Sequence, residues 1–396
     1  MSRVLVFRRS RSNPVSLPAP VAIHDAPRRE GPPAAPAPAC PPGPFALLFT
    51  RTVADAPMEV LSVLAAGDRI YAMGSMVWTL LHAATGEVVA RGLRGLGDGA
   101  LDPLLPLLYQ PDAQGQLDGL HFDAGQRVFW SPLYLNANLL RTFLARVGDS
   151  LLLLGSERSH PASGSFEPKL SCLEALTVGP GPEVRPSGQL APGMTSPLLW
   201  QALGWTAAAW AQGLAIAFPG EIHRVDESLD IVRVLTFHGE PVALSVDAAG
   251  VLHLLVDAPG EPRALWIVAW DGQRSLRLPL PAPYDRTQQP PLLLPTGQVL
   301  VRAPAGLLCL GQGGEIHWTG CLAPDGGAVA LADGSVLATD GHDLVRFAAD
   351  GARTIVHQFP DHLLCGPPLV SDGGEITLAT RTEILRLRPC PAHPVP

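Results

Sequence analysis

Short apolar runs separated by glycine-bearing pairs recur along the chain from Phe45 onward. The clearest copy is residues 291–318, which read PLLLPTGQVLVRAPAGLLCLGQGGEIHW. Apolar runs alternate there with turns, the first at Thr296-Gly297 and the last at Gly313-Gly314. Two-residue hairpin turns need a positive φ, which glycine adopts at little steric cost. The pattern therefore predicts four consecutive antiparallel strands, each joined to the next by a short loop.

The same pattern repeats in other parts of the chain. Further copies span residues 62–91, 241–278, 327–359 and 366–388, and in the last of these the first turn is predicted at Asp372-Gly373. The first turns of successive copies lie at residues 67, about 115, 148, about 206, 250, 297, 334 and 373. Short strands with a period of about 40 residues are typical of β-propeller blades. We therefore predict an all-β propeller of seven or eight blades: eight is favoured, and seven follows if residues 109–130 are an insertion.

The last copy lacks a fourth strand of its own. Residues 45–50, FALLFT, are predicted to supply that strand, because pairing the two ends of the domain would protect an otherwise open sheet edge. The predicted propeller then spans residues 45–388, followed by a C-terminal tail of residues 389–396. Residues 1–44 contain eleven prolines and are predicted to be an extended or disordered tail, since such a segment cannot build a packed core.

Three of the copies, residues 62–91, 291–318 and 327–359, resemble the repeats of pyrroloquinoline-quinone-like β-propellers. The matching features are the DGSV inner turn at residues 333–336, the ATGEVV outer turn at residues 84–89, and Trp318. Trp318 resembles the tryptophan that docks neighbouring blades in that family. The resemblance implies the fold of the family.

The cofactor site of that family is not matched. The resemblance implies that its quinone-dependent dehydrogenases use an adjacent cysteine pair and a calcium site of Glu, Asn and Asp. This chain has no Cys-Cys dipeptide, and its asparagines are Asn13, Asn136 and Asn138. We therefore predict no cofactor.

The composition suits such a fold and narrows the range of partners. The chain is 47% hydrophobic and 16% charged, against about 25% charged in ordinary proteins, as expected for strands buried on both faces. Residues 1–30 carry a net charge of +4. Since the whole chain has a net charge of −8, the remaining residues carry −12. An acidic body disfavours binding to a phosphate backbone. Nucleic-acid binding is therefore expected only through the basic residues of the tail, Arg3, Arg8, Arg9 and Arg11.

The cysteines and the longest apolar stretch bear on location. None of the six cysteines forms a C-x-x-C pair, so we expect free, buried thiols in a reducing cytoplasm. The opening MSRVLVFRRSR is too poor in apolar residues for a secretory signal. Residues 197–218 carry no charge and are long enough to span a bilayer. They divide at glycine-bearing pairs into three strand-length runs, so they predict buried strands and no membrane contact.

The candidate chemistry lies in the loops that join the second and third strands of each copy. Asp340, His342 and Asp343 could hold a metal or act as a base, but the same residues are ordinary turn formers. Arg381 and Glu383 could bind an anionic group, or form a solvent-facing ion pair. The histidines are scattered singly, without metal-ligand spacing. No metal site is therefore predicted.

The function predicted on these grounds is a non-enzymatic protein-interaction scaffold that uses the rim and the central-channel face of the propeller to bind a protein partner. Two other interpretations stay open. One is a channel-centred hydrolase or lyase that uses Asp340, His342 and Asp343. The other is a sensor of a small ligand or carbohydrate.

Overall fold

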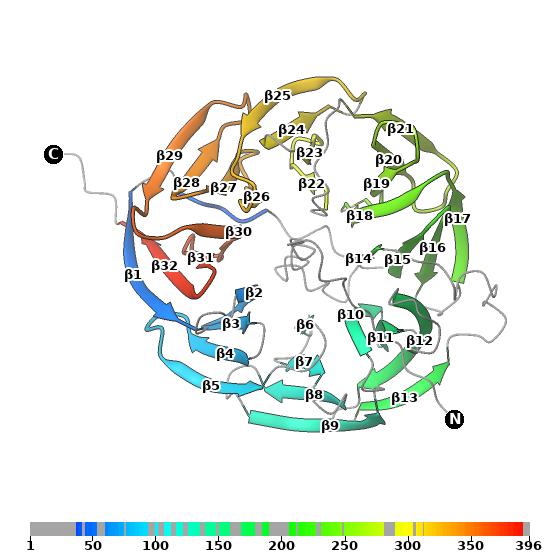
Figure 1. Cartoon of the computed structure of the whole chain (residues 1–396), viewed down its shortest axis with the longest axis horizontal. Coiled ribbons are helices and arrows are strands. Elements are labelled where there is room, and N and C mark those ends of the chain that lie inside the picture. The colour runs from blue at the N-terminus through cyan, green and yellow to red at the C-terminus, as the bar shows by residue number, and fades with distance from the viewer. Residues whose placement is uncertain are drawn as a thin grey trace. The chain divides into compact units, whose positions relative to one another are not determined.

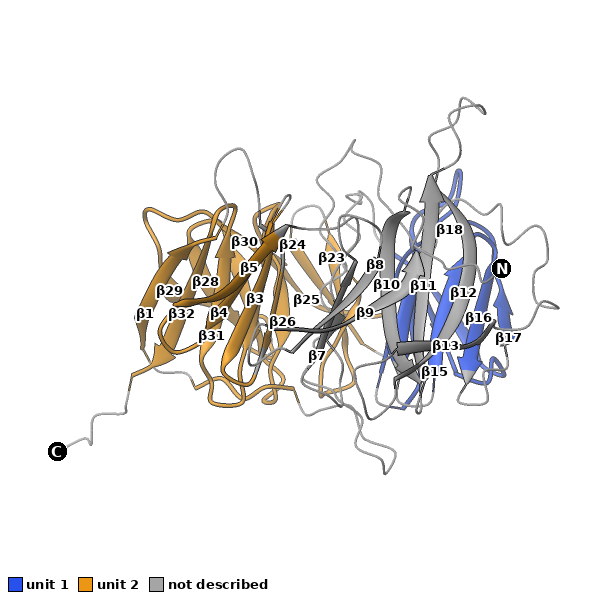
Figure 2. Ribbon diagram, turned by 90° about the horizontal axis from the view of Figure 1, so that it is seen from below, with its two compact units in different colours: residues 1–15, 24–35, 93–282 blue, residues 16–23, 36–92, 283–396 orange. Residues whose placement is uncertain are grey.

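The computed structural model describes residues 37–41, 44–53, 60–74, 77–93, 100–101, 107–111, 116–121, 126–134, 139–147, 150–158, 168–178, 184–189, 206–210, 213–226, 231–247, 249–280, 290–303, 306–311 and 313–390. Every regular element in these ranges is a β-strand, which confirms the predicted all-β class. The strands belong to two compact units, coloured separately in Figure 2. The first includes residues 93–282, and the second includes residues 36–92 and 283–396.

The strands of the second unit, which Figure 1 labels, pair into four-stranded antiparallel sheets. The first sheet holds β2 (Val60–Ala66), β3 (Arg69–Gly74), β4 (Val77–His82) and β5 (Val88–Leu93). The second holds β22 (Leu292–Leu293), β23 (Val299–Ala303), β24 (Gly306–Leu310) and β25 (Ile316–Cys321). The third holds β26 (Ala328–Ala330), β27 (Val336–Asp340), β28 (Asp343–Phe347) and β29 (Arg353–Gln358). The last has the order β1-β32-β31-β30, from β1 (Phe45–Thr52), β30 (Leu364–Val370), β31 (Ile376–Thr380) and β32 (Glu383–Pro389).

The first unit is built from sheets of the same kind. One sheet holds β6 (Ala100–Leu101), β7 (Leu107–Pro111), β8 (Gln116–His121) and β9 (Gln126–Tyr134). The next holds β10 (Leu139–Val147), β11 (Ser150–Arg158), β12 (Pro168–Val178) and β13 (Val184–Gln189). Another holds β14 (Thr206–Trp210), β15 (Gly213–Phe218), β16 (Glu221–Asp226) and β17 (Ile231–Thr236). The last holds β18 (Glu240–Val246), β19 (Leu252–Asp257), β20 (Ala264–Val268) and β21 (Ser275–Pro279).

The sheet that contains the last repeat is completed by the N-terminal strand, as the sequence predicts. β1 pairs with β32 in antiparallel register from Phe45↔Pro389 to Thr52↔Glu383. The Cys390 amide donates to the Pro44 carbonyl over 2.8 Å and continues the ladder by one bond. Both ends of the domain therefore share one sheet, and neither β1 nor β32 is left unpaired on the side where they meet.

Glycines occupy the predicted turns, with one correction. Gly297 and Gly334 have φ of 81° and 80°, as a hairpin turn requires. In the last repeat the positive φ, 74°, falls on Gly374 and not on Gly373. The physical reason is the bond that closes the turn, from the Ser371 amide to the Glu375 carbonyl, which places the left-handed residue directly before Glu375.

Neighbouring sheets dock through a side chain set against a turn glycine. Trp318, on the outermost strand of its sheet, packs on Gly351 of the next sheet, where an added Cβ would lie 2.6 Å from the indole side chain. Its ring also stacks on Phe347, with centroids 5.6 Å apart. Phe49 meets Gly86 in the same way, at 2.7 Å. The predicted docking of Trp318 on a neighbouring repeat is confirmed, and the apolar cluster between these sheets contains it.

Two further predictions meet the structure in this part of the chain. Residues 206–210 and 213–218, the described part of the longest uncharged stretch, form β14 and β15, which pair as antiparallel strands and not as a helix. No helix among the described residues could cross a membrane. The cysteines described are free, but Cys40 and Cys309 alone among them are buried, so the expectation of generally buried thiols was too broad.

Packed residues begin before the predicted propeller boundary at residue 45. Cys40 is 8% exposed and belongs to the apolar cluster between the sheet of β26–β29 and the sheet of β30 and β1. A small apolar side chain fits there although the surrounding prolines cannot join a ladder. Residues 37–41 therefore form no regular element but contact the sheets, with Cys40 buried among them.

Candidate functional site

The candidate residues lie at one end of the last two sheets of the second unit. In a four-stranded antiparallel meander, the loop between strands two and three lies at the same end as the connection to the next sheet. We call this the loop end: it consists of the β27–β28 loop (340–343), the β31–β32 loop (380–383), and the connections 322–327 and 359–363. The two candidate groups predicted separately therefore occupy adjacent loops.

Asp340 serves the fold as a double acceptor. Its Oδ1 accepts from the Ala323 amide over 2.6 Å, and its Oδ2 accepts from Arg353 Nη2 over 2.8 Å. Arg353 also lies 3.7 Å from Asp343 Oδ2. Asp343 Oδ1 accepts from the side-chain Nε2 of Gln358 over 3.0 Å. Both carboxylates thus bind the outermost strand or the incoming connection of their own sheet.

His342 links its loop to the connection that follows. Its Nδ1 donates to the carbonyl oxygens of Phe359 and His362, over 3.2 and 3.0 Å. Two carbonyl acceptors place the proton on Nδ1. The Phe359 amide in turn donates to the His342 carbonyl over 2.8 Å. The imidazole therefore holds the β27–β28 loop against the connection that leads into β30.

Glu383 and Arg381 complete the loop end from the last sheet. Glu383 Oε2 lies 3.0 Å from His362 Nδ1, so His362 joins the two candidate groups. Arg381 pairs with Asp325 over 3.8 Å, and the side chains are 61% and 48% exposed. An ion pair this exposed contributes little to stability. It leaves both charges accessible from solvent.

Close to these residues is an exposed apolar side chain. Leu363, between His362 and β30, is 44% exposed. At the end of β29, the rings of His357 and Phe359 are 4.5 Å apart, and burial lowers the pKa of His357. The loop end thus carries an exposed aliphatic residue and exposed charges of both signs. Among the described residues, no group of three His, Cys, Asp or Glu side chains could hold a metal ion.

Comparison with known proteins identifies the fold. No protein-family model and no curated protein sequence matches the chain. The crystal structure of BamB from Moraxella catarrhalis matches 87% of this chain and 99% of its own, with 12% identity and a TM-score of 0.56. The quinohemoprotein alcohol dehydrogenase ADHIIG from Pseudomonas putida HK5 matches 89% of this chain and 78% of its own, with 11% identity and a TM-score of 0.56. Both are β-propellers of pyrroloquinoline-quinone-like repeats.

The chain has a β-propeller fold. This confirms the fold class and the family resemblance predicted from the repeats, whereas the choice between seven and eight blades stays a prediction. Identities of 11 and 12% show the fold and carry no activity to this propeller.

Sequence reasoning missed four residues of the propeller's loop end: Asp325, Arg353, His362 and the buried Arg302. Arg302 Nη2 donates to the carbonyl of Pro324 over 3.3 Å and so holds the connection on which Asp325 stands. Each of these residues pairs with a partner 13 or more residues away along the chain, and repeat patterns show strands and turns but not such pairings. The one signal present was position, since Asp325 and His362 lie in connections at the same end as the predicted loops, whereas Arg353 begins β29 at the opposite end and only its side chain reaches Asp340.

Asp340→Ala is expected to lower the free energy of unfolding of the propeller by about 1–3 kcal/mol, because the partly buried Ala323 amide and Arg353 both lose their acceptor. Urea denaturation of the purified protein measures this. Asp343→Ala is the matched control, with an expected loss below about 1 kcal/mol, since its bond to Gln358 is exposed. Equal losses for the two variants would contradict a structural role of Asp340.

Proposed function

We propose that this propeller is a non-enzymatic protein-binding scaffold and that the loop end is its contact surface. The observation that carries the proposal is the use of the candidate polar groups: Asp340, His342 and Glu383 each hydrogen-bond another residue of the fold. A base or nucleophile must present its reactive atom to a substrate. Asp340 and Glu383 instead direct their carboxylate oxygens at groups of the fold, and His342 uses its Nδ1–H to hold its loop against the next connection.

A braced surface is suited to recognition. Loops that are already ordered lose little conformational entropy when a partner binds, so more of the contact energy appears as affinity. Protein contact surfaces combine an apolar centre with a polar rim. Leu363 supplies an exposed aliphatic side chain, and Arg381 and Asp325 supply charges of both signs at the same end of the sheets. The partner that fits is a folded protein with an apolar spot flanked by both kinds of charge.

We infer a cytoplasmic location for this scaffold. The cysteines described are free, and Cys321 is exposed. Exposed free thiols persist in reducing compartments and are oxidised in secreted proteins. A redox-proteomic measurement on intact cells would find Cys321 reduced.

The test begins with crosslinking of the tagged full chain in cells, followed by identification and purification of the crosslinked protein. Binding of that protein to the double variant Leu363→Asp, Arg381→Glu is expected to weaken at least tenfold, since each change inserts a wrong charge at the contact. The matched control is Leu276→Asp, Arg277→Glu, on the outermost strand β21 of the other unit, where Leu276 is 43% exposed. Biolayer interferometry measures both affinities, and circular dichroism checks the fold.

Three results would contradict this function. One is that the control variant loses as much affinity as the loop-end variant. Another is that the loop-end variant binds the partner as tightly as the wild type does. Alternatively, the protein yields no stable partner and shows catalysis that disappears in the Asp340→Ala, His342→Ala, Asp343→Ala variant.

A further inference from the structure

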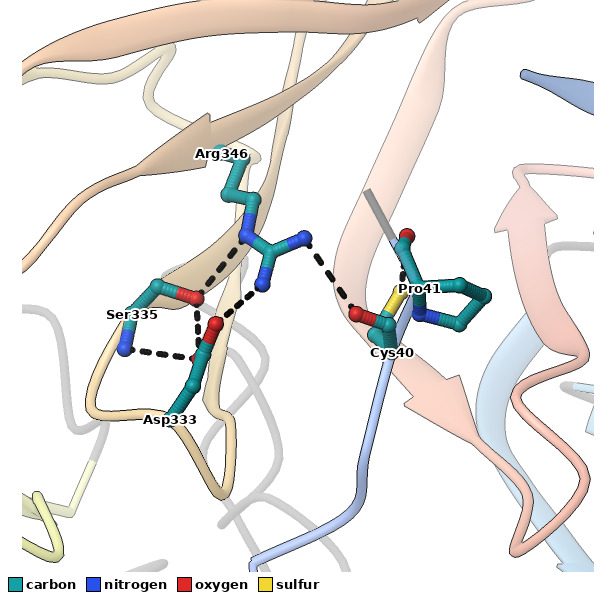
Figure 3. Close-up of polar contacts among 5 residues, drawn as sticks. All are labelled: Cys40, Pro41, Asp333, Ser335 and Arg346. Carbon is teal, nitrogen blue, oxygen red and sulfur yellow. Dashed lines mark hydrogen bonds and ion pairs between the residues drawn. The ribbon is translucent and has the colours of Figure 1, made fainter. Parts of the chain in front are cut away.

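Residues 37–41 lie against the end of the sheets opposite the loop end, and we call this segment the clasp. The Pro38 carbonyl accepts from the Ala332 amide over 3.1 Å. The Cys40 carbonyl accepts from Arg346 Nη1 over 3.2 Å, as Figure 3 shows. Pro41 approaches the next sheet, since a Cβ on Gly374 would lie 2.8 Å from its Cδ. The clasp therefore contacts turns from two neighbouring sheets.

The guanidinium that holds the clasp is itself held in place. Arg346 Nε donates to Ser335 Oγ over 2.9 Å, and Nη2 forms an ion pair with Asp333. Ser335 Oγ donates to Asp333 Oδ1 over 2.6 Å. Burial works to raise the pKa of Asp333, but the hydrogen bonds from Ser335 and the charge of Arg346 hold it below its ordinary value. Asp333, Ser335 and Arg346 thus form an ordered receptor for a backbone carbonyl (Figure 3).

The side chain of Cys40 adds an apolar contact to these hydrogen bonds. It is 8% exposed and lies in a cluster with Leu331, Val370 and Phe45, which come from both sheets and from β1. Burial raises the pKa of its thiol, Arg346 opposes this and Asp333 adds to it. A buried thiol of raised pKa reacts slowly with electrophiles. The reactivity of Cys40 therefore reports whether the clasp is docked.

We propose that the clasp is a releasable latch between the two sheets, which opens as a local unit while the sheets stay paired. Among the described residues, one backbone hydrogen bond, one hydrogen bond from the Arg346 side chain and one buried side chain hold the clasp, whereas β1 and β32 share a ladder along their whole length. Segments with few contacts open at a lower free energy than the sheets they cover. Only three residues separate the clasp from β1. Whether the clasp is docked or open therefore determines how the basic residues 1–36 are connected to the strand that completes the last sheet. A partner that binds the open clasp more tightly than the docked one would release it.

Two other cysteines of the propeller provide reference alkylation rates for testing the latch. Cys321 is exposed and marks fast alkylation. Cys309 is fully buried, with its pKa raised to about 11 by burial, and marks global unfolding. Under native conditions the alkylation rate of Cys40 by iodoacetamide, followed by peptide mass spectrometry, is expected to lie between the two.

Arg346→Ala is expected to raise the Cys40 rate about tenfold and to leave Cys309 unchanged, since one charge-assisted hydrogen bond to the clasp is lost. Arg346 lowers the pKa of Cys40, so its removal alone would slow the docked thiol, and an increase can come only from opening. The control is Arg277→Ala, which breaks a surface ion pair with Glu261 and touches no clasp residue. If Arg346→Ala fails to fold, Ser335→Ala removes one support of the guanidinium and tests the same latch.

Any of three outcomes would overturn the latch. Cys40 of the wild type reacts as fast as Cys321, so the clasp is not docked. Cys40 and Cys309 accelerate together in the variant, so opening is global. The Cys40 rate stays unchanged in both Arg346→Ala and Ser335→Ala, so the receptor does not hold the clasp.

Discussion

Trp318→Ala is expected to lower the free energy of unfolding by about 3–5 kcal/mol, the range for removing a buried aromatic side chain. The indole is 7% exposed and fills the space between two sheets, stacked on Phe347 and set over Gly351. Urea denaturation followed by circular dichroism measures the loss. Ile316→Ala is the matched control, because Ile316 lies on the same strand but is 51% exposed, and its expected loss is below about 1 kcal/mol.

Two further variants test the ring stacking of Trp318 and its close approach to Gly351 separately. Trp318→Phe is expected to retain most of the stability, because a phenyl ring keeps the stacking and the indole Nε1, buried without a hydrogen-bond partner, is removed. Gly351→Ala is expected to cost about 1–3 kcal/mol, since φ is 86° and the added Cβ meets Trp318. A loss for Trp318→Ala no larger than that for Ile316→Ala would show that this contact does not hold the sheets together.

Glu375→Ala is expected to cost about 3 kcal/mol or more, because it leaves a buried arginine without its charge partner. Arg386 Nη2 lies 2.8 Å from Glu375 Oε2, and the side chain of Arg386 is 3% exposed. Arg388, on the same strand and 54% exposed, shares the carboxylate. Thermal and urea denaturation measure the loss. Glu261→Ala is the control, with an expected loss below about 1 kcal/mol, because both partners of its ion pair with Arg277 are exposed.

The same carboxylate predicts a pH dependence. Burial works to raise the pKa of Glu375, but Arg386 and Arg388 hold it below its ordinary value. A lowered folded pKa means that the contribution to stability is fully present above the ordinary glutamate value of about 4.3 and is lost as the pH falls through the folded value. Wild-type stability is therefore expected to fall more steeply below about pH 4 than that of Glu375→Gln. Parallel curves for the two proteins would contradict the pairing.

The sequence predicts the repeating architecture well because that information is local. A glycine at residue 334 or 297 is required by the φ of its own turn, and the flanking apolar runs state which residues form strands. Even the pairing of residues 45–50 with the last repeat followed from counting strands. The error of one residue at Gly373 arose where two consecutive glycines offer the turn equal freedom, so that only the closing hydrogen bond chooses between them.

The candidate site was predicted less completely, and the reason is again physical. Asp340, His342, Asp343, Arg381 and Glu383 were singled out by their loops, but their partners come from connections distant in sequence. Whether a histidine in a turn acts as a general base or holds two loops together depends on which carbonyl groups lie within hydrogen-bond distance of its ring nitrogens. No repeat pattern contains that information.

By itself the sequence determined the class of structure: short apolar strands, glycine turns and a period of about forty residues permit little else. Only the tertiary structure decided what the polar and proline-rich residues do. It placed His362 between the two candidate groups and Cys40 between two sheets. Strand formation depends on neighbours in the chain, whereas these contacts depend on which loops the packing of whole sheets brings within a few ångströms.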